Sequence, residues 1–226
     1  MDHDSKGEVR KLYRTRDFLD AYSAHTDMRV EQDPKQAVGG MWEEIGDLQF
    51  EFLRASGLLP GHKLLDIGCG TLRGGRHFIR YLDEGNYFGI DISPKAIEAA
   101  QGLVQSEGLA TKDPTLVLSR SRDLKFREFE GERFDYLLAQ SVFTHLKPEH
   151  IRECFEHIER VMAPGSAFYF TFKAAGEFKQ REIKGFSYPF AFFERLGAET
   201  DFEIEDRSAA YPHPRGQRMV RASKPA

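Results

Sequence analysis

The stretch that decides the fold is KLLDIGCGTLRGGRHFIRYL, residues 63–82. Its first five residues, Lys63 to Ile67, form the short, mostly apolar run that a buried parallel strand contributes. Gly68 and Gly70 then allow backbone angles and close approaches that a side chain would prevent. From Gly74 onward, apolar residues recur at helical spacing. The stretch predicts a strand, a tight glycine turn and a helix, with backbone N–H groups facing an anionic or electron-rich ligand group.

Two acidic residues make this glycine turn more informative. Asp91 ends a second strand-like run, residues 87–91, about 20 positions after the turn, where a carboxylate suits the two hydroxyls of a ribose. Asp66 lies at the end of the first strand, beside the turn. A carboxylate there gives no advantage to a pyrophosphate, but it attracts a ligand that has a cationic amine and no phosphate. S-adenosylmethionine is such a ligand.

The same residues resemble two motifs of a known family. Leu65–Thr71, LDIGCGT, resembles the first motif of class I S-adenosylmethionine-dependent methyltransferases, and Gly89–Ser93, GIDIS, resembles the second. The resemblance extends from about Trp42 to the last predicted strand. One departure is Leu72, where the family often has a further glycine, and Arg73 follows it instead of a small residue. Glycines that merely turn a strand into a helix are the structural alternative.

Strand and helix patterns alternate along the rest of the chain. Helical patterns cover 94–106, 148–162 and 190–196, whereas a loop joins the last two strands. This alternation is typical of an α/β fold. We expect a Rossmann-like, seven-stranded, mostly parallel sheet with helices on both faces and an antiparallel last strand, as in the class I methyltransferase fold. The predicted strands are 63–67, 87–91, 115–119, 134–139, 167–172, 202–205 and 218–221.

Residues 1–61 precede this core and carry two helical patterns. The first runs from Glu8 to about Ser23, and Asp33-Pro34 breaks it; the second covers about 41–56. Residues 38–40 between them read as a flexible hinge. We divide the chain into an N-terminal helical extension, residues 1–61, and a class I methyltransferase domain, residues 62–226. The resemblance implies that the extension is a lid over the active site; helices that only pack on the core are the alternative.

Composition limits the partners and the compartment. The chain of 226 residues has a net charge of −4 and no long basic run, which argues against nucleic acid as a partner. Cys69 and Cys154 cannot form a disulfide framework, so a reducing compartment is expected. The N-terminus has no apolar signal core, and no stretch approaches the roughly 18 apolar residues of a membrane span. We expect a cytoplasmic protein without a membrane partner.

The predicted cofactor site lies where the carboxyl ends of the parallel strands meet. The resemblance implies that Asp123 and Leu124 contact the adenine, although an aspartate in a turn is more often a turn former. It also implies that Gln140 and Ser141 line the methionine end. Ile92 could form an apolar wall against the adenine or belong to the core. The predicted cofactor-binding residues are Asp66, Gly68, Cys69, Gly70, Asp91, Ile92, Asp123, Leu124, Gln140 and Ser141.

Methyl transfer needs few catalytic groups, because the sulfonium already activates the methyl group. The protein must hold the acceptor at attack distance, exclude water and, for a hydroxyl acceptor, remove a proton. His145, on the loop after the fourth strand, is the candidate base because histidine titrates near neutral pH. A helix cap or a lid contact is the alternative, and an amine acceptor would need no strong base. No cluster has metal-ligand spacing, so we expect no metal.

Two sets of residues could meet the acceptor. His213 and Arg215, on the loop between the last two strands, could contact a polar or anionic group, or could belong to an exposed hairpin connection. A set of aromatic side chains could form an acceptor pocket, although aromatics at such spacing are more often core. These are Trp42, Phe143, Phe186, Tyr188, Phe192 and Phe193.

These observations favour transfer of a methyl group from S-adenosylmethionine to an oxygen or nitrogen of a small-molecule acceptor. A dinucleotide-dependent oxidoreductase is the alternative enzyme class. It would need a third glycine at the position of Arg73, and its phosphates would face Asp66. A cofactor-binding protein without catalysis, acting through a partner, is the third possibility.

Overall fold

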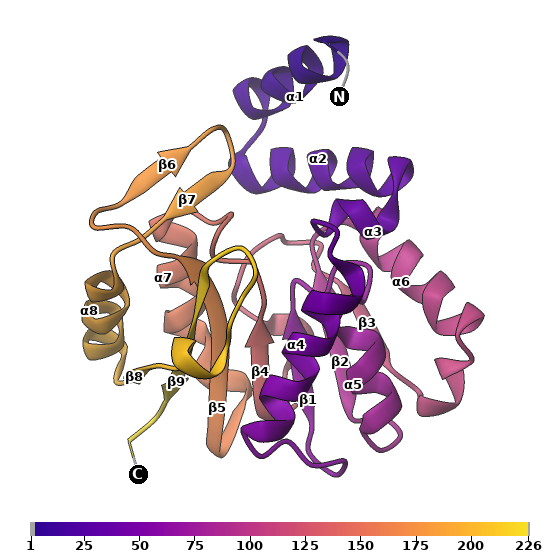
Figure 1. Ribbon diagram of the computed structural model, residues 1–226, viewed down its shortest axis with the longest axis vertical. Helices are drawn as coiled ribbons and strands as arrows, with labels where there is room; N and C mark the ends of the chain where they lie inside the picture. Colours follow the sequence, from indigo (N-terminus) through magenta and orange to yellow (C-terminus); the bar gives the residue numbers. More distant parts are fainter. Residues whose placement is uncertain (1–2, 226) are drawn as a thin grey trace.

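A central seven-stranded sheet organises the computed structural model of the protein, which describes residues 3–225 (Figure 1). The strand order is β3-β2-β1-β4-β5-β9-β8. Strands β1 to β5 pair in parallel, whereas β9 lies antiparallel between β5 and β8. This confirms the predicted Rossmann-like sheet and its antiparallel last strand. The strands are β1 (Leu64–Ile67), β2 (Tyr87–Asp91), β3 (Thr115–Leu118), β4 (Phe134–Ala139), β5 (Met162–Lys173), β8 (Glu203–Asp206) and β9 (Gln217–Ser223).

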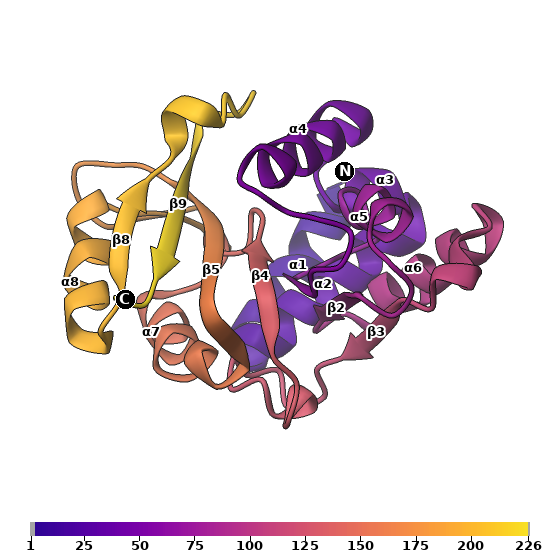
Figure 2. The same ribbon diagram turned by 90° about the horizontal axis from the view of Figure 1, so that it is seen from below.

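Helices cover both faces of this sheet (Figure 2). On one face lie α4 (Trp42–Ala55), α5 (Gly75–Tyr81) and α6 (Pro94–Ser106), and on the other lie α7 (Pro148–His157) and α8 (Phe190–Thr200). Neighbouring strand residues alternate between the two layers: Leu64 packs with the first and Leu65 with the second. Short 3-10 helices occupy Leu109–Lys112, Arg127–Phe129, Ile158–Val161 and Ser208–Ala210. Asp66 therefore faces the α4 and α5 side of the sheet.

Local sequence signals set the ends of several helices. Ser93 caps α6 by accepting a hydrogen bond from the Ala96 N–H at 3.0 Å, and Pro94 occupies the first turn. Gly57 follows α4 with φ +98°, a backbone angle that glycine adopts without strain.

None of the helices in residues 3–225 is long and apolar enough to cross a membrane.

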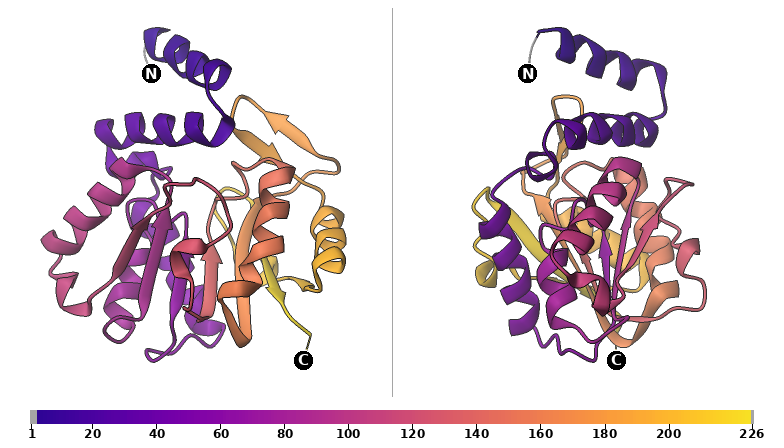
Figure 3. Two further views of the ribbon diagram at one scale, coloured as in Figure 1. Left: turned by 180° about the vertical axis from the view of Figure 1, so that it is seen from behind. Right: turned by 90° about the vertical axis from the view of Figure 1, so that its right-hand side faces the viewer.

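The N-terminal region differs from the single helix predicted over residues 8–23. The chain forms α1 (His3–Thr15) and α2 (Phe18–Gln32), followed by the short α3 (Pro34–Ala37). Asp17 breaks the pattern with an extended backbone, and Phe18 and Leu19 then pack against the sheet core. As a result, α2 crosses above the carboxyl ends of the strands (Figure 3). Helix α4 packs against α5 and belongs to the helical layer of the sheet.

A two-stranded hairpin, β6 (Lys179–Arg181) and β7 (Gly185–Ser187), was not predicted. Both strands are only three residues long, and β6 is exposed and polar, so the sequence contains no alternation of apolar and polar residues that would indicate the hairpin. Backbone hydrogen bonds from Phe186 N–H to Thr144 O and from Tyr188 N–H to Lys173 O fasten it above β4 and β5. The hairpin lies beside α2 at the same end of the sheet (Figure 1).

Candidate active site

One cavity of about 320 Å³ lies at the carboxyl ends of β1, β2 and β4, beneath α2. Its volume falls in the usual range for small-molecule sites, about 300–1,000 Å³. The structure brings into its wall every residue predicted to bind the cofactor, and also the predicted base His145. Their roles in binding and catalysis stay predictions. The lining also includes residues from α2, from the 37–39 linker and from the turn between β6 and β7.

The glycine turn takes the tight conformation that the sequence predicts. Gly68 has φ +69°, and a Cβ there would lie 2.6 Å from Val142 Cγ2. Gly70 has φ +56°, and a Cβ there would lie 2.7 Å from Val38 Cγ1 in the linker after α3. Leu72, at the position where the family often has glycine, also adopts a left-handed angle of +69° and is fully buried. Leu72 therefore preserves the conformation of the turn, although its left-handed backbone angle costs about 1–2 kcal/mol.

Asp91 joins the tip of β2 to the glycine turn. Its Oδ2 accepts the Gly70 N–H at 3.0 Å and its Oδ1 accepts the Ser93 N–H at 2.8 Å. Burial raises the pKa of Asp91, while these N–H donors oppose the rise. Each carboxylate oxygen has a further lone pair, so both can still accept from ribose hydroxyls.

Asp66 has a buried partner that the sequence interpretation missed. The Tyr87 hydroxyl donates to Asp66 Oδ2 at 2.8 Å, and Asp66 is only 4% exposed. Burial raises the pKa of Asp66 to about 7, and the hydrogen bond from Tyr87 partly offsets the rise. A cationic ligand group would stabilise this buried carboxyl in its charged form, because an opposite charge nearby lowers a raised carboxyl pKa.

This raised pKa predicts proton release on cofactor binding. Near pH 7 part of the Asp66 carboxyl population is protonated in the free protein, and a bound ammonium group shifts it to the carboxylate. Calorimetric titrations with S-adenosylhomocysteine in buffers of different ionisation enthalpy measure the release. Affinity should rise from pH 6 to pH 8, and Asp66→Asn should lower affinity and remove Asp66's contribution to the release. The same release in the variant as in the wild type would contradict the assignment.

The predicted adenine contacts have other partners in this structure. Asp123 Oδ1 accepts the Lys125 N–H at 3.1 Å, so this aspartate does stabilise a turn. Its Oδ2 lies 3.4 Å from Arg127 Nη1. The Leu124 N–H donates to Glu153 Oε2 at 3.1 Å. Binding of an adenine ring nitrogen by Leu124 therefore requires that Glu153 give up this hydrogen bond. Both predicted residues line the cavity.

The loop after β4 is tied to the loop between β8 and β9. Ser141 has φ +62°, and its N–H donates to Thr171 Oγ1 at 2.7 Å. The Gln217 amide contacts both Ser141 Oγ, at 2.9 Å, and Thr171 Oγ1, at 2.7 Å. The Tyr211 hydroxyl donates to Gln140 Oε1 at 2.8 Å. Tyr211 and Gln217 therefore position the two predicted residues, a role that the sequence interpretation missed.

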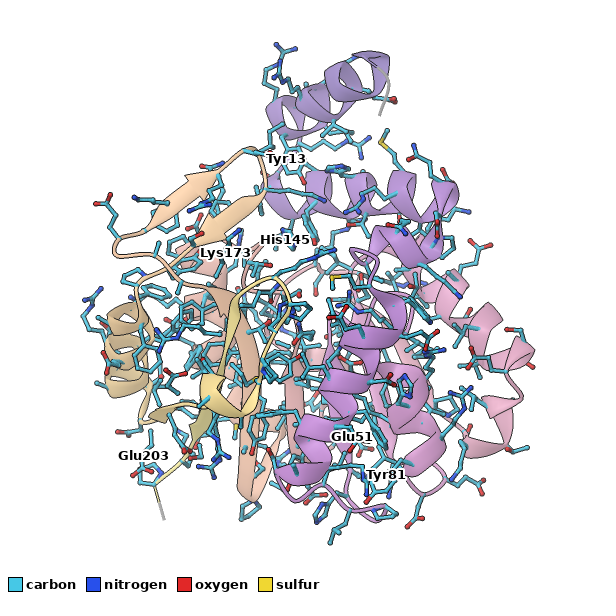
Figure 4. The ribbon with its side chains drawn as sticks, in the orientation of Figure 1. Tyr13, Glu51, Tyr81, His145, Lys173 and Glu203 are labelled. Carbon is cyan, nitrogen blue, oxygen red and sulfur yellow. The ribbon has the colours of Figure 1, made fainter. Side chains whose placement is uncertain are left out.

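His145 lies beneath α2, with Tyr13 near the junction of α1 and α2 (Figure 4). Its Nδ1 lies 2.8 Å from Lys184 O, and because a carbonyl only accepts, Nδ1 carries the proton and Nε2 is the free acceptor. Its ring packs 5.5 Å from that of Tyr22. Burial, with the charges of Lys184 and Arg29, lowers the pKa of His145 to about 4. The expectation that His145 titrates near neutral pH is therefore wrong: the ring is neutral at pH 7, and its basic nitrogen is free.

The loop containing His213 and Arg215 lines the cavity. His213 Nδ1 accepts the Arg215 N–H at 3.1 Å, so Nε2 carries the proton; this buried atom has no hydrogen-bond partner within the described part of the chain. The Arg215 guanidinium donates to Gly39 O. Arg73 donates to Val38 O at 2.8 Å and to Gly40 O at 3.1 Å. Two arginines therefore hold the linker between α3 and α4 against the cavity.

The six aromatic residues considered for an acceptor pocket do not line the cavity. Phe143, Phe186, Tyr188 and Phe193 are buried in the core between the sheet and α7 and α8. The aromatic side chains in the cavity wall are Tyr22 and Phe126. The core alternative is therefore the one that the structure supports for those four residues.

The seven-stranded sheet, with its glycine turn and the aspartates that follow β1 and β2, has the fold of class I S-adenosylmethionine-dependent methyltransferases. The family model described as a methyltransferase domain matches residues 65–168. A cyclopropane-fatty-acyl-phospholipid synthase of Escherichia coli K12 is 31% identical over 111 residues, which are 49% of this chain and 26% of that protein. The sterol 24-C-methyltransferase erg6 of Aspergillus fumigatus is 30% identical over 113 residues, which are 50% and 28% of the two chains. This chain spans about a quarter of the length of these curated relatives.

Solved structures share the same fold. The magnesium protoporphyrin IX methyltransferase (ChlM) of Synechocystis PCC 6803, solved with bound SAM, aligns with a TM-score of 0.64 at 18% identity, over 99% of this chain and 92% of that one. An S-adenosylmethionine-dependent methyltransferase of Clostridium acetobutylicum aligns with a TM-score of 0.66 at 11% identity, over 88% and 98% of the two chains. At these identities the likeness shows the fold.

Proposed function

We propose that the protein transfers the methyl group of S-adenosylmethionine to an oxygen or nitrogen of a small-molecule acceptor. The observation that carries the proposal is one cavity whose wall holds both Asp66 and Asp91 beside the glycine turn. Asp66 suits the ammonium group of the cofactor, and Asp91 suits its ribose hydroxyls. Ile92 and Leu124 offer apolar surface to the adenine. The structures solved with bound SAM and S-adenosylhomocysteine have this fold, which supports the same cofactor here.

The cavity fits a dinucleotide less well. Asp66 would lie close to a pyrophosphate bound at the glycine turn, and like charges repel. The guanidinium of Arg73, at the position of the missing third glycine, donates to Val38 O and Gly40 O. It therefore serves the linker between α3 and α4.

The protein's contribution to the reaction is orientation, exclusion of water and proton removal. S-adenosylmethionine supplies an activated methyl group and leaves as S-adenosylhomocysteine. His145 Nε2 takes the proton of a hydroxyl acceptor, since the Lys184 carbonyl fixes the ring and its tautomer. Helix α2 lies above His145 (Figure 4), and its Tyr22 ring packs 5.5 Å from the imidazole. The name of the sterol relative specifies a carbon acceptor; we favour oxygen or nitrogen here because His145 offers a base at the cavity.

His145→Ala should lower turnover of a hydroxyl acceptor by about 10²–10⁴-fold, the usual contribution of a positioned base. Affinity for S-adenosylhomocysteine should stay within about twofold of the wild type, because the variant removes no predicted cofactor contact. Turnover and calorimetric affinity are measured on the same preparation. His157→Ala, on α7 and outside the cavity, is the control. A variant with the wild-type rate would show that His145 is not the base or that none is needed.

The proposed function is tested by titrating the purified protein with S-adenosylmethionine, S-adenosylhomocysteine and NAD in parallel. Binding of the first two without NAD is the expected result. NAD binding alone would overturn the role given to Asp66 and with it the methyltransferase proposal. Formation of S-adenosylhomocysteine in the presence of an acceptor panel then separates an enzyme from a protein that only binds the cofactor.

A further inference from the structure

Among the described residues, four lysine and arginine side chains of the cavity wall have no acidic partner: Arg73 and Arg215, which hold the linker between α3 and α4, and Arg29 and Lys184. Arg29 comes from α2 and Lys184 from the turn between β6 and β7, and both line the cavity. Over residues 7–225, where side chains are described, no carboxylate oxygen lies within 4.0 Å of either charge. Arg122 in the same wall differs, since it pairs with Asp20 at 2.7 Å. Arg29 and Lys184 therefore place positive charge in the cavity wall without an ion pair within the described residues, although the more distant Glu182 carboxylate partly stabilises the charge of Lys184.

The surroundings of Lys184 make its charge costly, and Arg29 adds a second positive charge nearby. The Arg29 guanidinium donates to the neutral Gln36 O at 2.6 Å, and Lys184 Nζ lies over the Tyr22 ring, 5.1 Å from its centre. Burial and the charge of Arg29 lower the pKa of Lys184 to about 8. The same two cations lower the pKa of His145. An anion bound between them would relieve this repulsion.

A second basic group in the cavity occupies a different place. Burial and the charges of Arg73 and Arg215 lower the pKa of His213, and both arginines donate to carbonyls of the 38–40 linker beside Gly70. That group adjoins the glycine turn, where the amino-acid part of the cofactor is expected. Arg29 and Lys184 instead act on His145, the candidate base. The two groups therefore serve different parts of the cavity, and Arg29 and Lys184 are the pair available to the acceptor.

We propose that the acceptor is a small organic acid whose carboxylate lies between the Arg29 guanidinium and the Lys184 ammonium group, with its nucleophilic atom toward His145 Nε2. This inference rests on the proposed function. An arginine and a lysine together supply charge-assisted hydrogen bonds to both carboxylate oxygens. Leu19, Val142 and Leu146 in the same wall provide apolar surface for the body of the acid.

The test compares acids with their neutral amides. The full chain loaded with S-adenosylhomocysteine is titrated at pH 7 with benzoate and hexanoate, and with benzamide and hexanamide. The acids should bind about tenfold more tightly than the amides, because a hydrogen bond to a charged group contributes more than one to a neutral group. Lys184→Gln and Arg29→Gln should each reduce this preference severalfold. Raising the pH from 7 to 9 should also weaken acid binding in the wild type, since Lys184 loses its charge near pH 8.

The matched control is Lys179→Gln. Lys179 is an exposed residue on β6 of the same hairpin, and its Nζ lies 3.5 Å from Glu177 Oε1. The Lys179→Gln variant therefore removes one positive charge from the hairpin, as Lys184→Gln does, but outside the cavity. Its acid preference should equal that of the wild type. Equal binding of acids and amides, or no binding of either acid at millimolar concentration, overturns this inference and leaves the proposed function intact. Failure of S-adenosylhomocysteine itself to bind overturns both.

Discussion

Asp91→Ala is expected to weaken binding of S-adenosylhomocysteine by about a hundredfold or more. The substitution removes the acceptor predicted for two ribose hydroxyls, and a hydrogen bond to a charged group contributes about 1.5–3 kcal/mol. It also leaves the Gly70 and Ser93 N–H groups without their acceptor, so the glycine turn loses its link to β2. Calorimetric titration of the wild type and the variant measures the effect.

Two comparisons separate binding from folding. Asp83→Ala removes an exposed carboxylate after α5, outside the cavity, and should leave the affinity unchanged. Asp91→Asn keeps oxygen acceptors for part of the contacts and should lose less affinity than Asp91→Ala. Thermal unfolding without ligand shows whether each variant is folded. Wild-type affinity in a folded Asp91→Ala protein would remove Asp91 from the ribose site.

Signals that lie close together in the sequence predicted the centre of the fold. The glycine turn, the flanking apolar runs and Ser93-Pro94 each act within a few residues, so strand β1, strand β2 and the start of α6 follow from local chemistry. The hairpin of β6 and β7 and the break at Asp17 depend on packing against distant segments. Phe18, for example, stacks on His150 and packs against Phe186. Such contacts leave no periodic pattern in the sequence.

The same distinction applies to the site. Tyr87 could have been found, because it is a hydroxyl at the start of a strand that is otherwise apolar up to Asp91, and it lies on the same sheet face as Asp66. Arg29 and Lys184 could not, since they meet only after α2 and the hairpin fold over the same strand ends. The net charge of −4 describes the whole chain and does not reveal this local positive charge. The low pKa of His145 likewise results from burial that the sequence does not show.

Removal of residues 1–40 should reduce acceptor turnover by at least about a hundredfold, the loss expected when reacting groups are no longer held in position. The sheet and its two helical layers lie within residues 42–223, so this core should remain folded. The deletion removes α2, which is anchored to the cofactor side by Ser23 Oγ donating to Ile92 O at 2.8 Å. Its Asp27 carboxylate also accepts from Ser93 Oγ at 2.6 Å. Circular dichroism and turnover of the truncated chain are the measurements.

The pH dependence of the residual activity distinguishes a lid from a helix that only packs on the core. Without α2, water reaches His145, Arg29 is absent, and the pKa of His145 should rise from about 4 toward its ordinary value of 6.5. The acidic limb of the turnover profile should therefore move to higher pH. Asp27→Ala keeps α2 but removes one anchor, so its effect should be smaller and in the same direction. A truncated protein with full activity and an unchanged profile would contradict the lid, because water access to His145 is the physical reason for both effects.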